Sequence, residues 1–119
     1  MAERPAFFAD NHFRGPVQKA LRKWADVIRT VDLFGEKNDD EELLSHAAKE
    51  GMVFLTSDEG IHTIANTWFR TGRMDFRMIY CRMELHREMT DGEIAQGIED
   101  IMTRPNAFTY PIEYVKPRR

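Results

Sequence analysis

Apolar runs of four residues alternate along this chain with stretches in which apolar positions recur every three or four residues. The clearest run, residues 52–55, follows Gly51 and leads into a Thr-Ser-Asp triplet that ends at Asp58. Such a run between turn formers is typical of a strand buried on both faces, as in parallel sheets. Residues 6–9 repeat this design and lead into Asp10. Both patterns predict a buried strand with an aspartate at or just after its carboxyl end.

Three further segments are rich in β-branched, aromatic or other apolar residues, and we expect each to form a strand. They are residues 27–33, 76–83 and 108–115. The last segment contains Pro111, which cannot donate a hydrogen bond to a neighbouring strand. We therefore expect this strand at an edge of the sheet.

Between the strands, the apolar spacing predicts four helices, each with one buried face. They begin near residues 16, 39, 58 and 90 and end near residues 25, 50, 72 and 104. Three of these starts carry residues that favour helix N-termini: Asp39 or Asp40, Asp58, and Thr90 with Glu93 three residues later. The chain thus alternates strand and helix over most of its length.

This alternation predicts an α/β fold, a three-layer α/β/α sandwich with a mostly parallel five-stranded sheet. We expect residues 1–119 to form a single domain, because a chain of this length matches one hydrophobic core. Residues 116–119, Lys-Pro-Arg-Arg, are expected to form a frayed basic tail.

The composition narrows the class of protein. Hydrophobic residues make up 42% and charged residues 31%, which is ordinary for a soluble globular domain. No apolar run approaches the roughly 20 residues of a membrane helix, and there is no signal-peptide core, so we expect a cytoplasmic protein without membrane contact. The single Cys81 excludes an internal disulfide framework.

Charge is unevenly distributed along the chain. The net charge of −3 argues against strong non-specific binding of nucleic acid, which rests on Lys and Arg neutralising phosphates. Residues 14–29 nevertheless hold five basic residues against one acid, and residues 36–42 hold five acids against one base. Either the basic stretch attracts a polyanion or both stretches are solvated surface.

The candidate chemistry is acidic, because the common nucleotide, zinc and nucleophile motifs are missing from the sequence. Asp10 and Asp58 follow strands, and Glu42 lies in the first turn of a predicted helix. If the two strands are neighbours, about 4.8 Å apart, the two aspartates can converge at the sheet edge where α/β proteins bind ligands. Carboxylate oxygens suit Mg²⁺ or Mn²⁺ rather than zinc.

Three short pieces of the chain resemble the PIN-like nucleases, and most closely the small bacterial proteins of the DUF5615 or Mut7-C-like PIN group. The pieces are residues 9–12 (Ala-Asp-Asn-His), 40–47 (beginning Asp-Glu-Glu-Leu-Leu) and 54–58 (Phe-Leu-Thr-Ser-Asp). The resemblance implies a metal-dependent endoribonuclease with an RNA substrate. Several members of that superfamily serve as toxins of bacterial toxin and antitoxin pairs, so it also implies a small antitoxin as partner. The oligomeric state is left open, with a homodimer as one option.

By this resemblance, Asp10, Glu42 and Asp58 would be catalytic residues and ligands of Mg²⁺ or Mn²⁺, with Asp40 replacing or assisting Glu42. The chain departs from the family where the third piece usually reads Thr-x-Asp-x-Asp, because the last Asp falls on Gly60.

Two consequences of this departure stay open. Either Glu59 supplies a fourth carboxylate, or the site has three acids and binds metal weakly. The alternative function is a non-catalytic α/β binding module on a degenerate PIN-like scaffold. A receiver-type phosphoacceptor domain ranks last, because Asp10 is followed by Asn11 rather than by a second acid.

Polar residues near the acids complete the candidate site. Asn11, Arg14 and Lys19 are the candidate contacts to the RNA backbone. Thr56 and Ser57 either bond to nearby backbone or hold a metal-bound carboxylate in place. His12 is expected to pack or hydrogen-bond locally.

Each acid also has a purely structural interpretation. Asp58 can cap the helix that follows it, and Glu42 can complete a capping box with Asp39. Asp10 can form a turn with Asn11.

Overall fold

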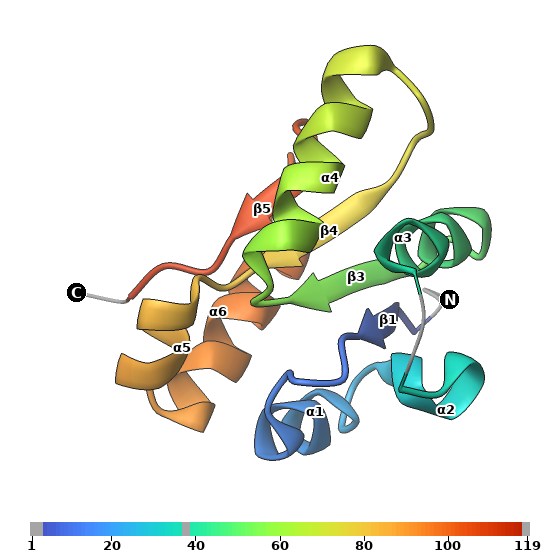
Figure 1. Cartoon of the computed structure of the whole chain (residues 1–119). Helices are drawn as coiled ribbons and strands as arrows, with labels where there is room; N and C mark the ends of the chain where they lie inside the picture. Colours follow the sequence, from blue (N-terminus) through green and yellow to red (C-terminus); the bar gives the residue numbers. More distant parts are fainter. Residues whose placement is uncertain (1–3, 37–38, 118–119) are drawn as a thin grey trace.

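The computed structural model of the chain describes residues 4–36 and 39–117. In this part of the chain, five strands form one sheet in the order β2-β1-β3-β4-β5, and every neighbouring pair is parallel (Figure 1). The strands are β1 (Ala6–Ala9), β2 (Asp26–Arg29), β3 (Val53–Thr56), β4 (Arg77–Tyr80) and β5 (Ile112–Tyr114). The predicted α/β fold with a five-stranded parallel sheet is confirmed.

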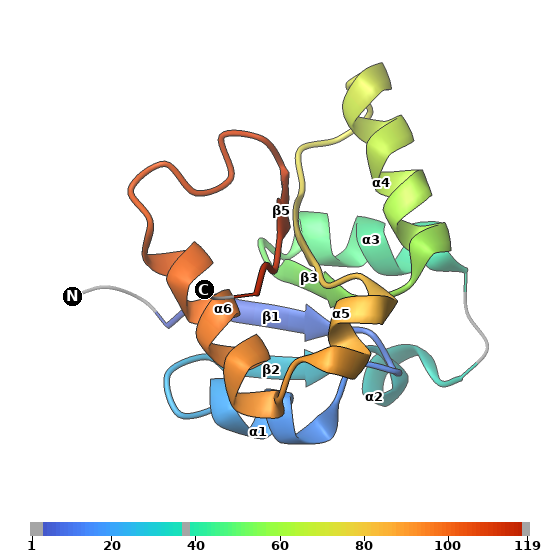
Figure 2. The same ribbon diagram turned by 90° about the vertical axis from the view of Figure 1, so that its left-hand side faces the viewer.

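Helices cover both faces of the sheet. They are α1 (Gly15–Leu21), α2 (Thr30–Phe34), α3 (Asp40–Lys49), α4 (Glu59–Thr71), α5 (Met83–Glu88) and α6 (Asp91–Thr103). Successive strand residues point to opposite faces, so the sheet contributes to two apolar clusters. Phe7 and Leu55 pack with residues of α1 and α6, whereas Phe8 and Phe54 pack with residues of α3 and α4. Figures 1 and 2 show these two helix layers on either side of the sheet.

Three of the four predicted helix starts are confirmed by side-chain caps, and α1 begins without one. The Asp39 carboxylate accepts from the Glu41 N–H, and Asp58 caps α4. Thr90 and Glu93 form the reciprocal bonds of a capping box at the start of α6. These caps satisfy backbone N–H groups that have no partner inside the helix.

The predicted strand at residues 27–33 is wrong beyond Arg29. β2 ends at Arg29, and the chain continues directly into the short helix α2. The β-branched residues of this segment do not distinguish a strand from a single helical turn. Arg29 and Asp32 form an ion pair across the first turn of α2, and Gly35, with φ of 73°, ends the helix.

The predicted strand at residues 76–83 is also too long, because β4 ends at Tyr80 and α5 follows it. α5 was not predicted from the sequence. It has six residues, too few to establish a helical period, and its buried side chain is His86 rather than an apolar residue.

The first helix and the last strand are also shorter than predicted. α1 ends at Leu21 instead of continuing to residue 25, and β5 begins at Ile112 instead of residue 108. The expected edge position of β5 is confirmed. Pro111 lies just before the strand, where its carbonyl accepts from the Met78 N–H at 2.8 Å.

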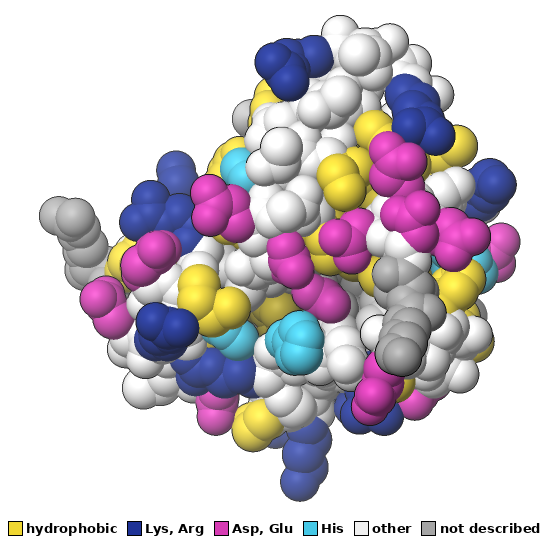
Figure 3. All heavy atoms as spheres, viewed as in Figure 1, with side chains coloured by type: hydrophobic (Ala, Val, Ile, Leu, Met, Phe, Trp, Pro, Cys, Tyr) yellow, Lys and Arg dark blue, Asp and Glu magenta, His cyan; other side chains and the backbone are white. Residues whose placement is uncertain are grey.

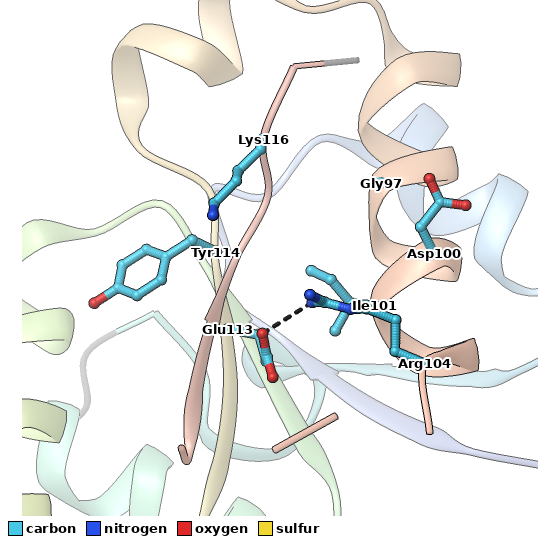
Figure 4. A pocket seen from close by; sticks show the side chains of 7 residues that line it. All are labelled: Gly97, Asp100, Ile101, Arg104, Glu113, Tyr114 and Lys116. Atoms are coloured by element: carbon cyan, nitrogen blue, oxygen red, sulfur yellow. Dashed lines mark hydrogen bonds and ion pairs between the residues drawn. The ribbon is translucent and has the colours of Figure 1, made fainter. Parts of the chain in front are cut away.

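The last helix approaches the edge strand closely at Gly97. A Cβ atom built on Gly97 would lie 3.0 Å from Val115 Cγ1, so a larger residue would push α6 away from the segment after β5. Beside this contact, Arg104 Nη2 and Glu113 Oε1 form an ion pair at 2.9 Å across a hollow of about 230 Å³ (Figure 4). The pair links α6 to β5.

Of the predicted basic tail at residues 116–119, residues 118–119 lie outside the described residues, and Lys116 and Pro117 are exposed and without regular structure. Within the described ranges, no helix has the length and apolar character needed to cross a membrane.

Candidate functional site

The site begins with the pairing of β1 and β3, which are neighbours as the candidate chemistry requires. Ala9 lies opposite Leu55, and the Asp10 N–H continues the ladder by donating to the Leu55 carbonyl at 2.8 Å. The Thr56 hydroxyl donates to Asp10 Oδ2 at 2.8 Å and accepts from the Asp58 N–H at 2.9 Å. One hydroxyl therefore connects the two aspartates that follow the strands.

Asp58 is fixed by the helix that it caps. Its Oδ1 accepts from the Gly60 N–H at 2.7 Å and from the Ile61 N–H at 3.2 Å. The structural interpretation of Asp58 is thus confirmed. Both bonds go to the same oxygen, so the cap leaves Oδ2 able to accept from or coordinate another group.

Asp40, the first residue of α3, is the third acid near Asp10 and Asp58. It lies three residues before Leu43 and four before Leu44, which are both buried, so Asp40 lies on the inward face of the helix. Burial raises the pKa of Asp40, and the negative charges of Asp58 and then Asp10 raise it further. Asp40 is therefore near enough to both Asp10 and Asp58 for their charges to act on it.

Asp10 is the most enclosed of these acids. Its side chain is buried beneath the sheet edge, and burial raises the pKa of the carboxyl group. Hydrogen bonds from the Thr56 hydroxyl and the Asn11 backbone N–H act in the opposite direction, and the charge of Asp58 raises the pKa again. The Asp10 carboxylate is therefore held in a fixed position next to a like charge.

The structure does not bring Glu42 to this group. Asp40 and Glu42 are two residues apart on α3, which separates their side chains by about 200° around the helix axis. Glu42 is exposed and lines a different pocket, of about 360 Å³, together with Glu41 and Lys49. Asp40, rather than Glu42, lies beside Asp10 and Asp58.

Glu59 and Gly60 follow Asp58 in the first turn of α4. Glu59 lines a pocket with Tyr80; burial raises the pKa of Tyr80, and the charge of Glu59 raises it further. At Gly60, a Cβ atom would lie 3.0 Å from Asp58 Oδ1, so a side chain there would press on the capping carboxylate. Neither position therefore adds a fourth acid beside Asp58. We call Asp10, Asp40 and Asp58 the aspartate group.

Comparison with known protein families matches residues 5–82 to the PIN like domain family. The chain belongs to the PIN-like domain family. The match spans two-thirds of the sequence, from just before β1 to just after β4, and it includes the whole aspartate group. Neither the curated proteins nor the solved structures that were compared gave a match.

Acidic side chains run across the middle of one face of this PIN-like domain, over the starts of α3 and α4, with Lys and Arg mainly around the margin (Figure 3). Of the predicted RNA contacts, Asn11 and Lys19 are exposed. Arg14 is not free, because its Nη1 lies 2.8 Å from Asp91 Oδ1 and ties the start of α1 to α6. Arg82, just after β4, is an exposed cation that the sequence reasoning missed.

The aspartate group fits a hard divalent cation in donor type, since Mg²⁺ and Mn²⁺ prefer carboxylate oxygens. Burial is the main cause of the raised pKa values of Asp10 and Asp40, and the neighbouring aspartate charges raise them further. A cation would relieve this repulsion between the carboxylates. Among residues 4–36 and 39–117, however, no three acidic, His or Cys side chains already lie close enough to hold a metal ion. Binding therefore requires the carboxylates to close around the cation.

Proposed function

We propose that this PIN-like domain is a Mg²⁺- or Mn²⁺-dependent endoribonuclease in which Asp10, Asp40 and Asp58 hold the metal. The observation that carries the proposal is that Asp10 just after β1, Asp40 at the start of α3 and Asp58 just before α4 lie near one another, so that the charges of Asp10 and Asp58 both act on Asp40. Asp10 and Asp58 follow the carboxyl ends of β1 and β3, the edge at which α/β sheets bind ligands.

Each residue of the site has a separate task in this proposal. The Thr56 hydroxyl holds the Asp10 carboxylate through a hydrogen bond, and the backbone N–H groups of α4 hold Asp58 in place. Asp40 approaches from the start of α3. A bound cation would lower the pKa of a water molecule and neutralise charge on the phosphodiester.

The RNA backbone is proposed to lie across the acidic face, between cations at its margin. Asn11 follows Asp10 directly, and Lys19 is exposed on α1. Because Asp91 engages Arg14, we assign the backbone contacts to Asn11 and Lys19 and give Arg14 the role of orienting α1.

The resemblance to the DUF5615 or Mut7-C-like PIN group supports a more specific role. On that basis we propose a cytoplasmic toxin whose small antitoxin partner covers the aspartate group. Covering this edge would block RNA and cation together.

The alternative function is a binding module that has lost catalysis. Two observations favour it: Gly60 stands where the family usually has a fourth acid, and the described carboxylates are not preassembled for a metal. Such a module would bind its partner with or without a divalent cation.

Cleavage of a panel of structured and single-stranded RNAs, with Mn²⁺ or with EDTA, tests the proposal. We expect Mn²⁺-dependent cleavage by the wild type and its loss in Asp10→Asn. Glu50→Gln, an exposed change just after α3, serves as the matched control. Equal cleavage by wild type and Asp10→Asn would refute the assignment.

A further inference from the structure

A further pocket lies at the same sheet edge as the aspartate group and has no role in the function proposed above. Its volume is about 390 Å³, and Ser57, Glu59, His62, Tyr80, Arg82 and Glu84 contribute to its lining. These residues come from the end of β3, the first turns of α4, the end of β4 and the start of α5. Ser57 directly precedes Asp58, so the pocket adjoins the acids.

Ser57 supplies the first sign that the pocket takes a polar ligand. The residue is only 6% exposed, and its hydroxyl has no hydrogen-bond partner among the described residues. The neighbouring Thr56 hydroxyl, in contrast, bonds to both Asp10 and Asp58. A buried hydroxyl without a partner costs free energy, which a ligand with a polar edge would recover.

Two aromatic rings that stack on each other line one part of the pocket. The His62 and Tyr80 rings lie nearly parallel, with centroids 4.2 Å apart and planes 6° apart. His62 is held further by its Nε2, which lies 2.8 Å from the Tyr114 hydroxyl. Burial lowers the pKa of His62, which favours the neutral form of its ring. Planar aromatic side chains of this kind stack on or border nucleobases.

The rim determines which bases would fit. Glu59 and Glu84 present carboxylates, which accept hydrogen bonds but cannot donate them when ionised. Arg82 lies 3.7 Å from Glu84, but both side chains are more than half exposed, so a ligand can displace this contact. A carboxylate accepts from the exocyclic amino group of cytosine and is repelled by the carbonyl oxygen that uracil carries at the same ring position.

We propose that this pocket binds a nucleobase of the RNA and selects bases with an exocyclic amino group over uracil. The Ser57 hydroxyl donates to a carbonyl or ring nitrogen of the base, and Glu59 or Glu84 accepts from the amino group. The inference deepens the nuclease proposal and rests on it for the position of the base beside the cleaved phosphodiester.

Cytidine and uridine make a matched pair of probes, because their bases differ in the amino or carbonyl group at one ring position. Binding is followed by NMR chemical shifts of the full chain in EDTA, at nucleoside concentrations on the order of millimolar. We expect cytidine to bind about tenfold more tightly than uridine. Equal affinities, or no binding of either nucleoside, would overturn the inference.

Variants separate the two contacts. Ser57→Ala should weaken the binding of both nucleosides, whereas Glu59→Gln combined with Glu84→Gln should reduce the cytidine preference severalfold. Glu50→Gln, outside the pocket lining, should keep the wild-type ratio. A Ser57→Ala protein that melts like wild type and binds cytidine equally well would contradict the assigned contact.

The same experiments distinguish failure of this inference from failure of the nuclease proposal. Mn²⁺-dependent cleavage without any preference for the flanking base would overturn the pocket's role and leave the nuclease standing. Selective cytidine binding in a protein that cleaves no RNA would support the base selectivity and refute the nuclease.

Discussion

Thr56 and Asp10, which are 46 residues apart in the sequence, are joined by a hydrogen bond of 2.8 Å between their side chains. The parallel register of β1 and β3 creates this contact, because it places the two residues side by side at the carboxyl ends of adjacent strands. The same Thr56 hydroxyl accepts from the Asp58 N–H. Thr56 therefore sets the positions of two members of the aspartate group.

Replacing Thr56 with Val should destabilise the protein by about 1–3 kcal/mol. The change leaves a buried carboxylate and a backbone N–H without their shared partner, while side-chain volume is kept. Thr56→Ser retains the hydroxyl and should lose less than half as much. Urea unfolding of the three proteins gives the comparison, and equal losses for Val and Ser would show that the hydroxyl is unimportant.

Asp58 should tolerate Asn but not Ala. Asn keeps an oxygen that can accept from the Gly60 and Ile61 N–H groups, whereas Ala removes the cap at a cost of about 1 kcal/mol. Asn also removes one charge from the group. In EDTA we expect Asp58→Asn to melt at or above the wild-type midpoint and Asp58→Ala to melt below it. If Asn proved as harmful as Ala, the cap would not explain the effect.

The buried Asp10 should make stability depend on pH. Because its pKa is raised in the folded state, the folded protein binds more protons than the unfolded chain between the ordinary and the raised pKa. Stability contributed by the protonated form is present at low pH and is lost as pH rises through this window. Asp10→Asn cannot titrate at this position. The difference in free energy of unfolding, variant minus wild type, should therefore increase as the pH rises from about 4. A difference that stays constant or decreases would contradict the raised pKa.

Arg14 should act through Asp91 rather than through RNA. The two side chains connect α1 to α6 at 2.8 Å, and the pair is partly buried. In a double-mutant cycle of Arg14→Gln and Asp91→Asn, we expect a coupling energy of about 0.5–1 kcal/mol. RNA affinity and its salt dependence should fall in Lys19→Ala and stay near wild type in Arg14→Gln. The reverse order would return Arg14 to the RNA interface.

Much of this fold could be predicted because its signals are local. The caps at Asp39, Asp58 and Thr90 each act within three residues, and the apolar runs that form β1 and β3 are bounded by turn formers. α2 was missed because β-branched residues also fit one turn of a helix.

The site was harder to predict because it depends on how the elements pack. The apolar face of α3 already implied that Asp40 points inward and Glu42 outward, and helical periodicity could have decided between them. The pairing of Arg14 with Asp91 spans 77 residues and depends on the packing of α1 against α6, which no local pattern encodes. That the Ser57 hydroxyl has no hydrogen-bond partner in the described part of the chain likewise follows only from the packed structure.

The proposed nuclease requires Asp10, Asp40 and Asp58 to bind one divalent cation, and the thermal midpoint of unfolding during a Mn²⁺ titration is the decisive measurement. A cation that binds only the folded protein must raise the midpoint. We predict a rise for the wild type and for Glu42→Gln, and little or none for Asp10→Asn or Asp40→Asn. An unchanged wild-type midpoint, or a rise that Glu42→Gln abolishes and Asp40→Asn keeps, would contradict the account.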